Sequence, residues 1–269
     1  MHFGVIGIRS KHLNFFRKAL AVCFPGGEHT ITHIWGCDAP ELLANHPDLT
    51  HCFSLEQMLP QVDGVIIALR EGYAHAALAK VCLEAGKPVF VDKPFTCDVT
   101  EAREIWDTAR RTGTPCTGGS TIALTKTVQQ LKNKLPHCDE YTISYMADPF
   151  SPFGGWYFYG SHLTDLCVTL FGDGWDSVSA AIRGDRVTAR VFYPGFTVTL
   201  QSSAEVQPFL FKADQDYVLD DVHCYEAGMR HFCAVAEGKD PGCTELMVSS
   251  VRLLDQILSA AREPQPYCE

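Results

Sequence analysis

The chain has 269 residues, of which 46% are hydrophobic and 20% are charged, a composition typical of a folded protein with one large or two modest domains. Its formal net charge is −10 and it has no run of Lys or Arg, which argues against binding to nucleic acid. No apolar stretch is long enough to span a bilayer, and the basic residues near the N-terminus follow the first apolar run instead of preceding it, unlike a signal peptide. We therefore expect a cytoplasmic protein that binds neither nucleic acid nor membranes.

The twelve cysteines are scattered along the chain up to Cys268 and include no C-x-x-C pair. Cys82, Cys167 and Cys233 fall within apolar helical patterns, where a thiol behaves as a small buried hydrophobic side chain. We expect reduced, structural cysteines in preference to disulfides, and no metal site.

The first 118 residues alternate between strand and helix patterns, which predicts a parallel sheet with both faces covered. The predicted strands are 2–6, 30–37, 64–69, one that opens at Lys87-Pro88 and one that finishes at Thr117. The predicted helices are 13–23, a short one near 55–59, 73–85 and 99–112. Gly86 and Gly113 should end the last two helices, and Thr96 or Asp98 should cap the last one.

Gly118-Gly119 is the predicted boundary between domains 1–118 and 119–269. The second domain is predicted to contain a helix over 121–135, strands at 141–148, 178–183, 187–192 and 196–203, a further strand within 209–219, and closing helices at 221–237 and 244–261. Because these strands repeat every two residues and are joined by short turns, we expect an α/β domain with a mostly antiparallel sheet that is open on one face.

A candidate nucleotide-binding turn follows the first strand, with the sequence GIRSKH. The ideal pattern is G-x-G-x-x-G, and only Gly7 conforms to it, since Arg9 and His12 occupy the other two glycine positions. The N-terminus of the next helix still offers free amides to a phosphate. The candidate cofactor contacts in the turn are Gly7, Ile8, Arg9, Ser10 and His12. The alternative is an ordinary strand–helix turn that binds nothing.

Asp38 ends the second predicted strand. An acid at this place accepts hydrogen bonds from a ribose diol and repels a 2′-phosphate. Neither of the next two residues, Ala39 and Pro40, is basic, so NAD is favoured over NADP. The alternative is that Asp38 caps the short helix that follows.

Asp92-Lys93-Pro94 lies just past the carboxyl end of a buried strand, where parallel sheets bind ligands and a lysine can donate or accept a proton. The segment 63–96 resembles the Glu-Lys-Pro region of the glucose–fructose oxidoreductase/inositol dehydrogenase (Gfo/Idh/MocA) family, with Asp92 in place of glutamate. The resemblance implies an N-terminal doubly wound Rossmann domain that binds NAD(P), a substrate-binding C-terminal domain, and a homodimer or homotetramer. We also expect the Lys93-Pro94 peptide to be cis, because the chain must turn sharply there.

The same resemblance places Leu69, Arg70, His75, Asp92 and Lys93 beside the cofactor. Leu69-Arg70-Glu71 departs from the small residue, proline and asparagine that are usual in the family. His75 matches a common family histidine, for which we expect a structural role with its ring bonded to the backbone.

The segment 154–165 resembles the family's glycine-rich turn into the helix that carries the catalytic histidine, a position taken here by His162. Phe158 stands where polyol dehydrogenases of the family carry an aspartate, and Tyr159 resembles the tyrosine of a Tyr-Gly-x-His subgroup. The implied catalytic residues are therefore Lys93, which would bond the substrate oxygen, and His162 or Tyr159 as base or proton relay. The alternative for His162 is a core histidine whose ring is satisfied by the backbone.

Asp165 lies one helical turn after His162 and would either orient its ring or serve as a first-turn acid. The aromatic residues between positions 150 and 159 would suit a wall that stacks on a sugar, although aromatic residues are more often core.

These features predict an NAD(P)-dependent oxidoreductase, with NAD favoured, that transfers hydride between a nicotinamide and a sugar-like or polyol hydroxyl or carbonyl. One alternative is a redox-neutral lyase or glycosidase with tightly held NAD. Another is a non-enzymatic sensor of nucleotide or sugar, which the altered glycine turn and Phe158 suggest.

Overall fold

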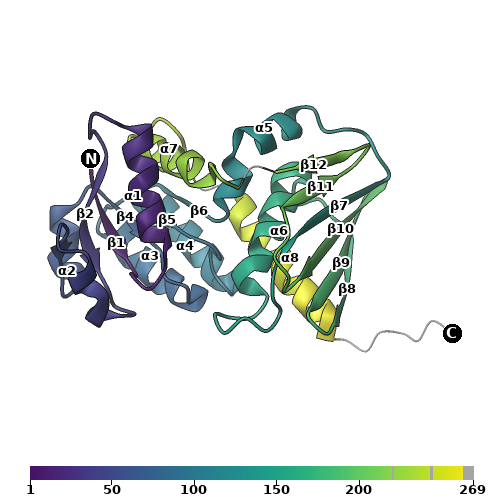
Figure 1. Ribbon diagram of the computed structural model, residues 1–269, viewed down its shortest axis with the longest axis horizontal. Helices are drawn as coiled ribbons and strands as arrows, with labels where there is room; N and C mark the ends of the chain where they lie inside the picture. The colour runs from purple at the N-terminus through teal and green to yellow at the C-terminus, as the bar shows by residue number, and fades with distance from the viewer. Residues whose placement is uncertain (220, 243–244, 263–269) are drawn as a thin grey trace.

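Two six-stranded sheets stand side by side, one formed by each half of the chain (Figure 1). The computed structural model describes residues 1–219, 221–242 and 245–262. Thr244, the first residue of the last predicted helix, lies outside these ranges, as do Cys243 and Cys268. The ten cysteines within them are free thiols. No helix in this part of the chain is long and apolar enough to cross a membrane.

The first sheet is entirely parallel and has the strand order β3-β2-β1-β4-β5-β6, which confirms the predicted doubly wound architecture. Its strands are β1 (His2–Ile6), β2 (Thr30–Trp35), β3 (Thr50–His51), β4 (Gly64–Ile67), β5 (Val89–Val91) and β6 (Cys116–Gly118). Every residue of β4 and β5 is buried, because helices cover both faces of the sheet.

The helices of this half follow the apolar periodicity of the sequence. They are α1 (His12–Cys23), α2 (Leu55–Met58), α3 (His75–Glu84) and α4 (Val99–Thr112), with 3₁₀ turns at Pro40–Asn45, Leu59–Gln61 and Gly72–Ala74. Asp98, and not Thr96, caps α4, since its carboxylate accepts a hydrogen bond from the amide of Glu101 at 3.0 Å. Gly113, with φ of 67°, ends the same helix as predicted.

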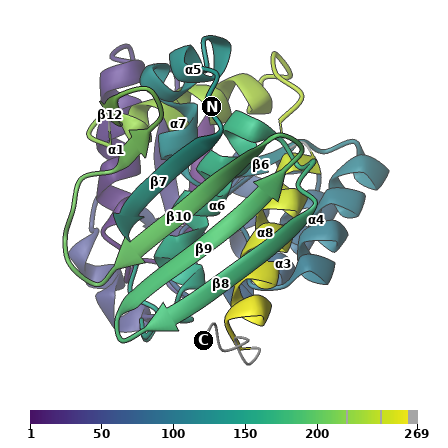
Figure 2. The ribbon, with the colours of Figure 1, turned by 90° about the vertical axis from the view of Figure 1, so that its right-hand side faces the viewer.

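The second sheet is mixed and mostly antiparallel, with the order β12-β11-β7-β10-β9-β8. Its strands are β7 (Glu140–Met146), β8 (Ser177–Arg183), β9 (Arg186–Tyr193), β10 (Phe196–Ser203), β11 (Leu210–Lys212) and β12 (Asp216–Val218). Only β7 and β10 pair in parallel. Helices α6 (Tyr157–Phe171) and α8 (Glu245–Arg262) lie behind one face, and the other face is open (Figure 2).

Two predicted elements of the second half are divided in the structure. The helix expected over 121–135 is a 3₁₀ turn, Thr121–Leu124, followed by α5 (Lys126–Asn133). Thr125 is extended between them, and its hydroxyl caps α5 by accepting a bond from the amide of Val128. The strand expected within 209–219 is a hairpin of β11 and β12, because a turn at Ala213 reverses the chain.

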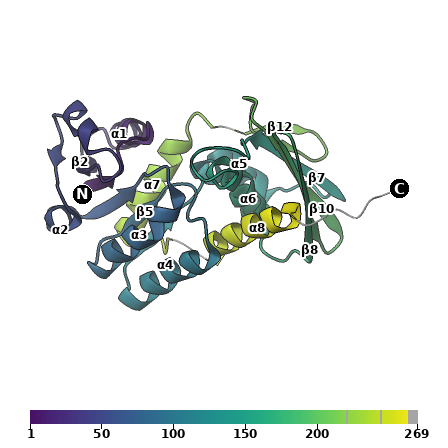
Figure 3. The same ribbon diagram turned by 90° about the horizontal axis from the view of Figure 1, so that it is seen from below.

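Helix α7 (Cys224–Ala236) comes after the second sheet in sequence but packs beside α1 on the first sheet (Figures 1 and 3). Its Phe232 ring lies 4.9 Å from that of Phe3 in β1 and 5.8 Å from that of Phe90 in β5, measured between ring centroids. Helix α8 then packs on both α4 and α6. The core of the first sheet therefore includes side chains from both sides of residue 118, the predicted boundary.

Candidate active site

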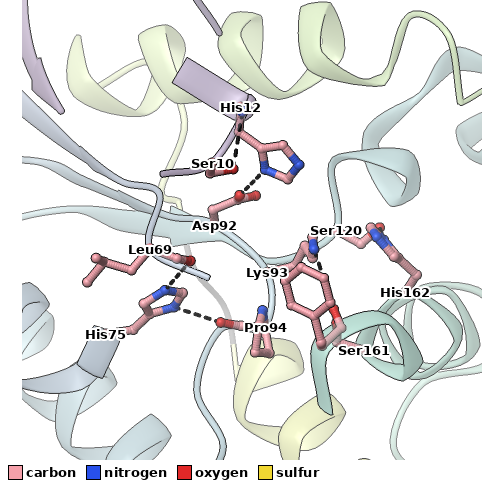
Figure 4. Close-up of polar contacts among 11 residues, drawn as sticks. Ser10, His12, Leu69, His75, Asp92, Lys93, Pro94, Ser120, Ser161 and His162 are labelled. Carbon is pink, nitrogen blue, oxygen red and sulfur yellow. Dashed lines mark hydrogen bonds and ion pairs between the residues drawn. The ribbon is translucent and has the colours of Figure 1, made fainter. Parts of the chain in front are cut away.

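The candidate site lies where the carboxyl ends of β1, β4 and β5 face helix α6 of the second half (Figure 4). Lys93 follows β5, Ser120 follows β6, and His162 comes from α6. No group of three or more His, Cys, Asp or Glu side chains within the described ranges is arranged to hold a metal ion.

The turn after β1 depends on its one remaining fingerprint glycine. Gly7 has φ of 92°, a conformation that L-residues avoid, and an added Cβ would lie 2.9 Å from the amide nitrogen of Leu69. Its own amide donates to the carbonyl oxygen of Trp35 at 2.9 Å. Gly7 therefore allows β1 to turn closely against the end of β4.

Asp38 closes this turn from the end of β2. Its two carboxylate oxygens accept bonds from the amides of Ile8 and Arg9 at 3.2 and 3.3 Å, and the Arg9 guanidinium donates to the Asp38 carbonyl oxygen at 2.7 Å. The 3₁₀ turn that follows has Ala39 at its N-cap and no side-chain cap, so Asp38 does not cap it. Two amides of the kind that face a phosphate in a glycine-rich turn thus face a carboxylate here.

A pocket of about 460 Å³ opens beside Asp38, between the ends of β2 and β4. Its walls are mainly apolar, and its polar groups include the carboxylates of Asp38 and Glu71 and the cation of Arg9. The lining residues are Arg9, Trp35, Cys37, Asp38, Leu69, Glu71, Tyr73, Ala74, Ala77 and Leu78. One Glu71 carboxylate oxygen is buried and has no hydrogen-bond partner among the described residues. Apolar walls with a few acceptors suit the adenosine part of a dinucleotide.

His12 begins α1, and its imidazole Nδ1 contacts the Asp92 carboxylate as a hydrogen-bonded ion pair (Figure 4). Burial raises the pKa of Asp92, but the charge and hydrogen bond of His12, with the charge of Lys93, outweigh it and hold that pKa below its usual value. The Tyr225 ring of α7 packs edge-on against His12 at 5.2 Å. The turn residue is thereby tied to the strand that delivers Lys93.

Lys93 is only 3% exposed, and the Lys93-Pro94 peptide is cis, as predicted. Its Nζ lies 3.6 Å from the ring centroid of Phe158 and 4.2 Å from that of Tyr159, and it donates weakly to the Phe158 carbonyl oxygen at 3.5 Å. Burial lowers the pKa of Lys93 to about 8, although the charge of Asp92 opposes the shift. The amine therefore exchanges a proton near neutral pH.

His162 is bonded to a side chain that the sequence did not single out. Its Nδ1 lies 2.6 Å from the Ser120 hydroxyl, and its ring stacks on Tyr159 with a centroid distance of 5.6 Å. Burial, and then the nearby Lys93 cation, lowers the pKa of His162 well below its usual value, so the ring is neutral at pH 7. Lys93 and His162 thus contact the same Tyr159 ring.

Asp165 orients Ser120 and not the histidine ring. Its carboxylate accepts a bond from the Ser120 amide at 2.6 Å and another from the Ser250 hydroxyl of α8. Burial raises the pKa of Asp165 to about 6, although both hydrogen bonds oppose the shift. The acid acts on His162 only through Ser120.

His75 is fully buried, with Nδ1 2.8 Å from the Pro94 carbonyl oxygen and Nε2 3.0 Å from that of Leu69 (Figure 4). Both ring nitrogens face backbone carbonyls, so His75 links the end of β4 to the turn after Lys93.

Most of the predicted site residues converge on this region, with Gly7, Ile8, Arg9 and Asp38 around one turn and Asp92, Lys93, Tyr159 and His162 at the cleft. Ser10 accepts a bond from the His12 amide at 3.1 Å and is a turn-forming residue. Ser120 was missed because it follows Gly118-Gly119, which is typical of a linker. No local sequence pattern predicts its bond to His162.

Comparison with known proteins relates the first half of the chain to a family of oxidoreductases. Residues 1–120 match the model of the oxidoreductase family with an NAD-binding Rossmann fold. Among curated proteins, the chain is 29% identical over 175 residues to the uncharacterized oxidoreductase YdgJ of Escherichia coli, an alignment that covers 58% of this chain and 50% of that protein. The chain spans about half the length of the curated relatives that it matches.

Two solved structures share the whole fold. UDP-N-acetylglucosamine 3-dehydrogenase GnnA from Acidithiobacillus ferrooxidans superposes with a TM-score of 0.80 at 19% identity, covering 97% of each chain. KijD10, a 3-ketoreductase from Actinomadura kijaniata in complex with NADP, gives 0.78 at 18% identity, covering 97% of this chain and 98% of its own. Residues 1–120 therefore have the NAD-binding Rossmann fold of the Gfo/Idh/MocA family of oxidoreductases.

Proposed function

We propose that this protein is an NAD(P)-dependent oxidoreductase that interconverts a hydroxyl and a carbonyl on a sugar-like substrate. The observation that carries the proposal is Lys93, a buried amine with a pKa of about 8 at the carboxyl end of β5. A group with such a pKa is suited to hold or release a proton at neutral pH.

In the oxidation direction, the neutral amine of Lys93 accepts the proton of the substrate hydroxyl. In the reduction direction, its ammonium returns that proton to the carbonyl oxygen. A bound nicotinamide would supply the hydride chemistry at the same carbon, so that alcohol plus NAD(P)⁺ would balance carbonyl plus NAD(P)H and one proton.

The other two predicted catalytic residues have supporting roles. Burial raises the pKa of Tyr159, so its hydroxyl keeps its proton and can donate a hydrogen bond to the substrate oxygen. His162 stays neutral, and Ser120 fixes its ring orientation through Nδ1. These two side chains orient the reacting oxygen toward Lys93, which carries the proton.

The pocket beside Asp38 would hold the adenosine part of the cofactor, with Asp38 and Glu71 as acceptors for ribose or base hydroxyl and amino groups. Two carboxylates disfavour a 2′-phosphate, so we favour NAD over NADP. Binding through the Asp38 carboxylate requires it to exchange its bonds with Ile8 and Arg9 for bonds to the ligand.

A sugar-like substrate is supported by the aromatic wall of Phe153, Phe158 and Tyr159, whose rings contact one another at centroid distances of 5.1 and 4.6 Å. GnnA and KijD10, which share the fold, are a UDP-N-acetylglucosamine dehydrogenase and a ketoreductase. We further propose that the open face of the second sheet assembles homodimers or homotetramers.

One observation favours a second candidate, a nucleotide or sugar sensor without turnover. The turn amides already bond Asp38, which weakens the argument for tight dinucleotide binding. A redox-neutral reaction with tightly held NAD is a third possibility, for which NAD should copurify and free NADH should not accumulate.

The test begins with nucleotide-free protein titrated with NADH and with NADPH, following nicotinamide fluorescence and thermal stabilisation. Selective binding of NADH at micromolar concentration supports the proposal and leads to a screen of hexoses, polyols and sugar nucleotides for NADH formation, with Lys93→Met as the inactive control. Absence of binding to either nucleotide would refute the oxidoreductase and leave the sensor.

A further inference from the structure

A second cation, Arg70, lies at the candidate cleft in addition to Lys93. It directly follows Leu69 past the end of β4 and is half-buried. Among the residues that the structure describes, Arg70 forms no ion pair with the adjacent Glu71 or with any other carboxylate. A half-buried, unpaired guanidinium at a ligand-binding edge calls for a partner.

A continuous aromatic wall connects Arg70 to Lys93. The Arg70 guanidinium carbon lies 4.8 Å from the ring centroid of Phe153, which is 5.1 Å from that of Phe158, and the Lys93 Nζ lies 3.6 Å above the Phe158 ring. Two cations therefore rest on adjoining rings of one wall. Stacking of this kind fixes a guanidinium in place without satisfying its hydrogen-bond donors.

The two charges also act on each other. Burial is the main cause of the lowered pKa of Lys93, and the charge of Arg70 lowers it further against the opposing effect of Asp92. Arg70 likewise lowers the pKa of Tyr159, although burial raises it overall. Arg70 is thus close enough for its field to reach both proposed catalytic groups.

Neither carboxylate that neighbours the two cations in sequence forms an ion pair with Arg70, and Glu71 lines the pocket beside Asp38 instead. Asp92, next to Lys93, is already paired with His12, and position 158, whose ring lies under Lys93, is phenylalanine. The wall is therefore positive and aromatic, which complements an anion joined to a sugar ring better than a neutral polyol.

We propose that Arg70 is an anion-binding subsite for the substrate, and that the preferred substrate is a sugar bearing a carboxylate or a phosphate. This inference rests on the proposed function, since it assigns the substrate class of the same cleft. The guanidinium binds the oxyanion with two parallel N–H donors, while Phe153 holds it in orientation. The sugar ring then lies along Phe158 toward Lys93.

The same oxyanion chemistry could come from the pyrophosphate of the cofactor, so the experiment separates the two sources. Wild type and Arg70→Gln are titrated by calorimetry with glucuronate, glucose 6-phosphate and glucose, each with and without saturating NADH, and with NADH alone. Arg190→Gln is the matched control, because Arg190 also lies over an aromatic ring, 5.4 Å from Phe192, but on the second sheet beside Glu140.

We expect glucuronate or glucose 6-phosphate to bind wild type at least about tenfold tighter than glucose, and Arg70→Gln to weaken the charged sugar by about 10- to 100-fold, so that the preference for charge disappears. Arg190→Gln should keep the preference. Charged sugars that bind no tighter than glucose, including no detectable binding of either, would overturn the subsite. A loss confined to NADH in Arg70→Gln would also overturn it and assign the arginine to pyrophosphate.

The measurement does not depend on turnover. Selective, Arg70-dependent binding of a charged sugar by a protein that binds neither NADH nor NADPH would sustain the subsite and contradict the oxidoreductase proposal. NADH formation from neutral sugars only, with no preference for charge, would sustain the oxidoreductase and contradict the subsite.

Discussion

Replacement of Lys93 by methionine should make the protein more stable while it greatly lowers turnover. Burial lowers the pKa of Lys93 from 10.5 to about 8, a difference of about 2.5 units, and each unit corresponds to about 1.4 kcal/mol. At pH 7 the buried Lys93 ammonium therefore lowers the free energy of unfolding by about 3 kcal/mol. Methionine keeps the stem and removes the charge, so Lys93→Met should recover an amount of that order.

The pH dependence of the free energy of unfolding provides a second test of the buried charge of Lys93. Because the folded pKa is depressed, the unfolded chain binds more protons between about pH 8 and 10.5, and the stability of the wild type should rise with pH through that window. The advantage of Lys93→Met should therefore be complete at pH 7 and shrink as the pH approaches 10. General acid–base catalysis contributes about 10²- to 10⁴-fold, so turnover should fall by that factor.

The assay is urea unfolding followed by circular dichroism at pH 7 and pH 9.5, with Lys18→Met as the matched control. Lys18 is exposed on α1, and its replacement should leave stability nearly unchanged at both pH values. If Lys93→Met were no more stable than wild type at pH 7, the amine would not be charged and desolvated as described, and the assignment of Lys93 as the proton carrier would lose its basis.

Three further predictions concern the same site. The kcat/KM of alcohol oxidation should rise with pH through an apparent pKa near 8, because Lys93 must lose its proton before it can accept that of the substrate. The kcat/KM of carbonyl reduction should fall over the same range. A flat pH profile in both directions would contradict the assignment of Lys93. Ser120→Ala should lower kcat/KM about tenfold, because it removes the hydrogen bond to His162 Nδ1. The free energy of unfolding should change by only about 1 kcal/mol. An unchanged kcat/KM would show that this hydrogen bond serves the fold and not the reaction. Asp38→Asn should shift the ratio of NADPH to NADH affinity by about tenfold toward NADPH, and an unaltered ratio in fluorescence titrations would remove Asp38 from cofactor selection.

Local patterns predicted most of the elements, because burial periodicity depends on neighbours in sequence. Strands His2–Ile6 and Phe196–Ser203 and helix Val99–Thr112 have the bounds that the sequence suggests. The break at Thr125 was missed because the hydroxyl of a threonine can cap a helix as well as sit within one. The packing of helix α7 on the first sheet could not be predicted from local sequence either, because the apolar stripe of a helix does not indicate which sheet it covers.

Some residues of the candidate site could likewise be predicted from local motifs, whereas contacts between distant elements could not. Lys93 and His162 were found because each lies in a short motif with its own resemblance to the family. The bond between Ser120 and His162 joins residues on different elements of the fold, and it depends on how β6 meets α6. The contact of Asp38 with the turn amides arises because residues 7–11 form a short turn between β1 and α1, so that the carboxylate occupies the space beside them.

The return of α7 to the first sheet has a consequence for synthesis on the ribosome. Residues 1–118 emerge with all strands of the first sheet, but the packing of Phe3 and Phe90 is not complete until Phe232 of α7 has been made. The stretch from residue 118 to the end of α7 at Ala236 is 118 residues long, and its synthesis takes on the order of 10 s at the usual rates of elongation. During that time the nascent chain exposes an apolar face, and the nucleotide-binding half cannot finish folding ahead of the half that follows it.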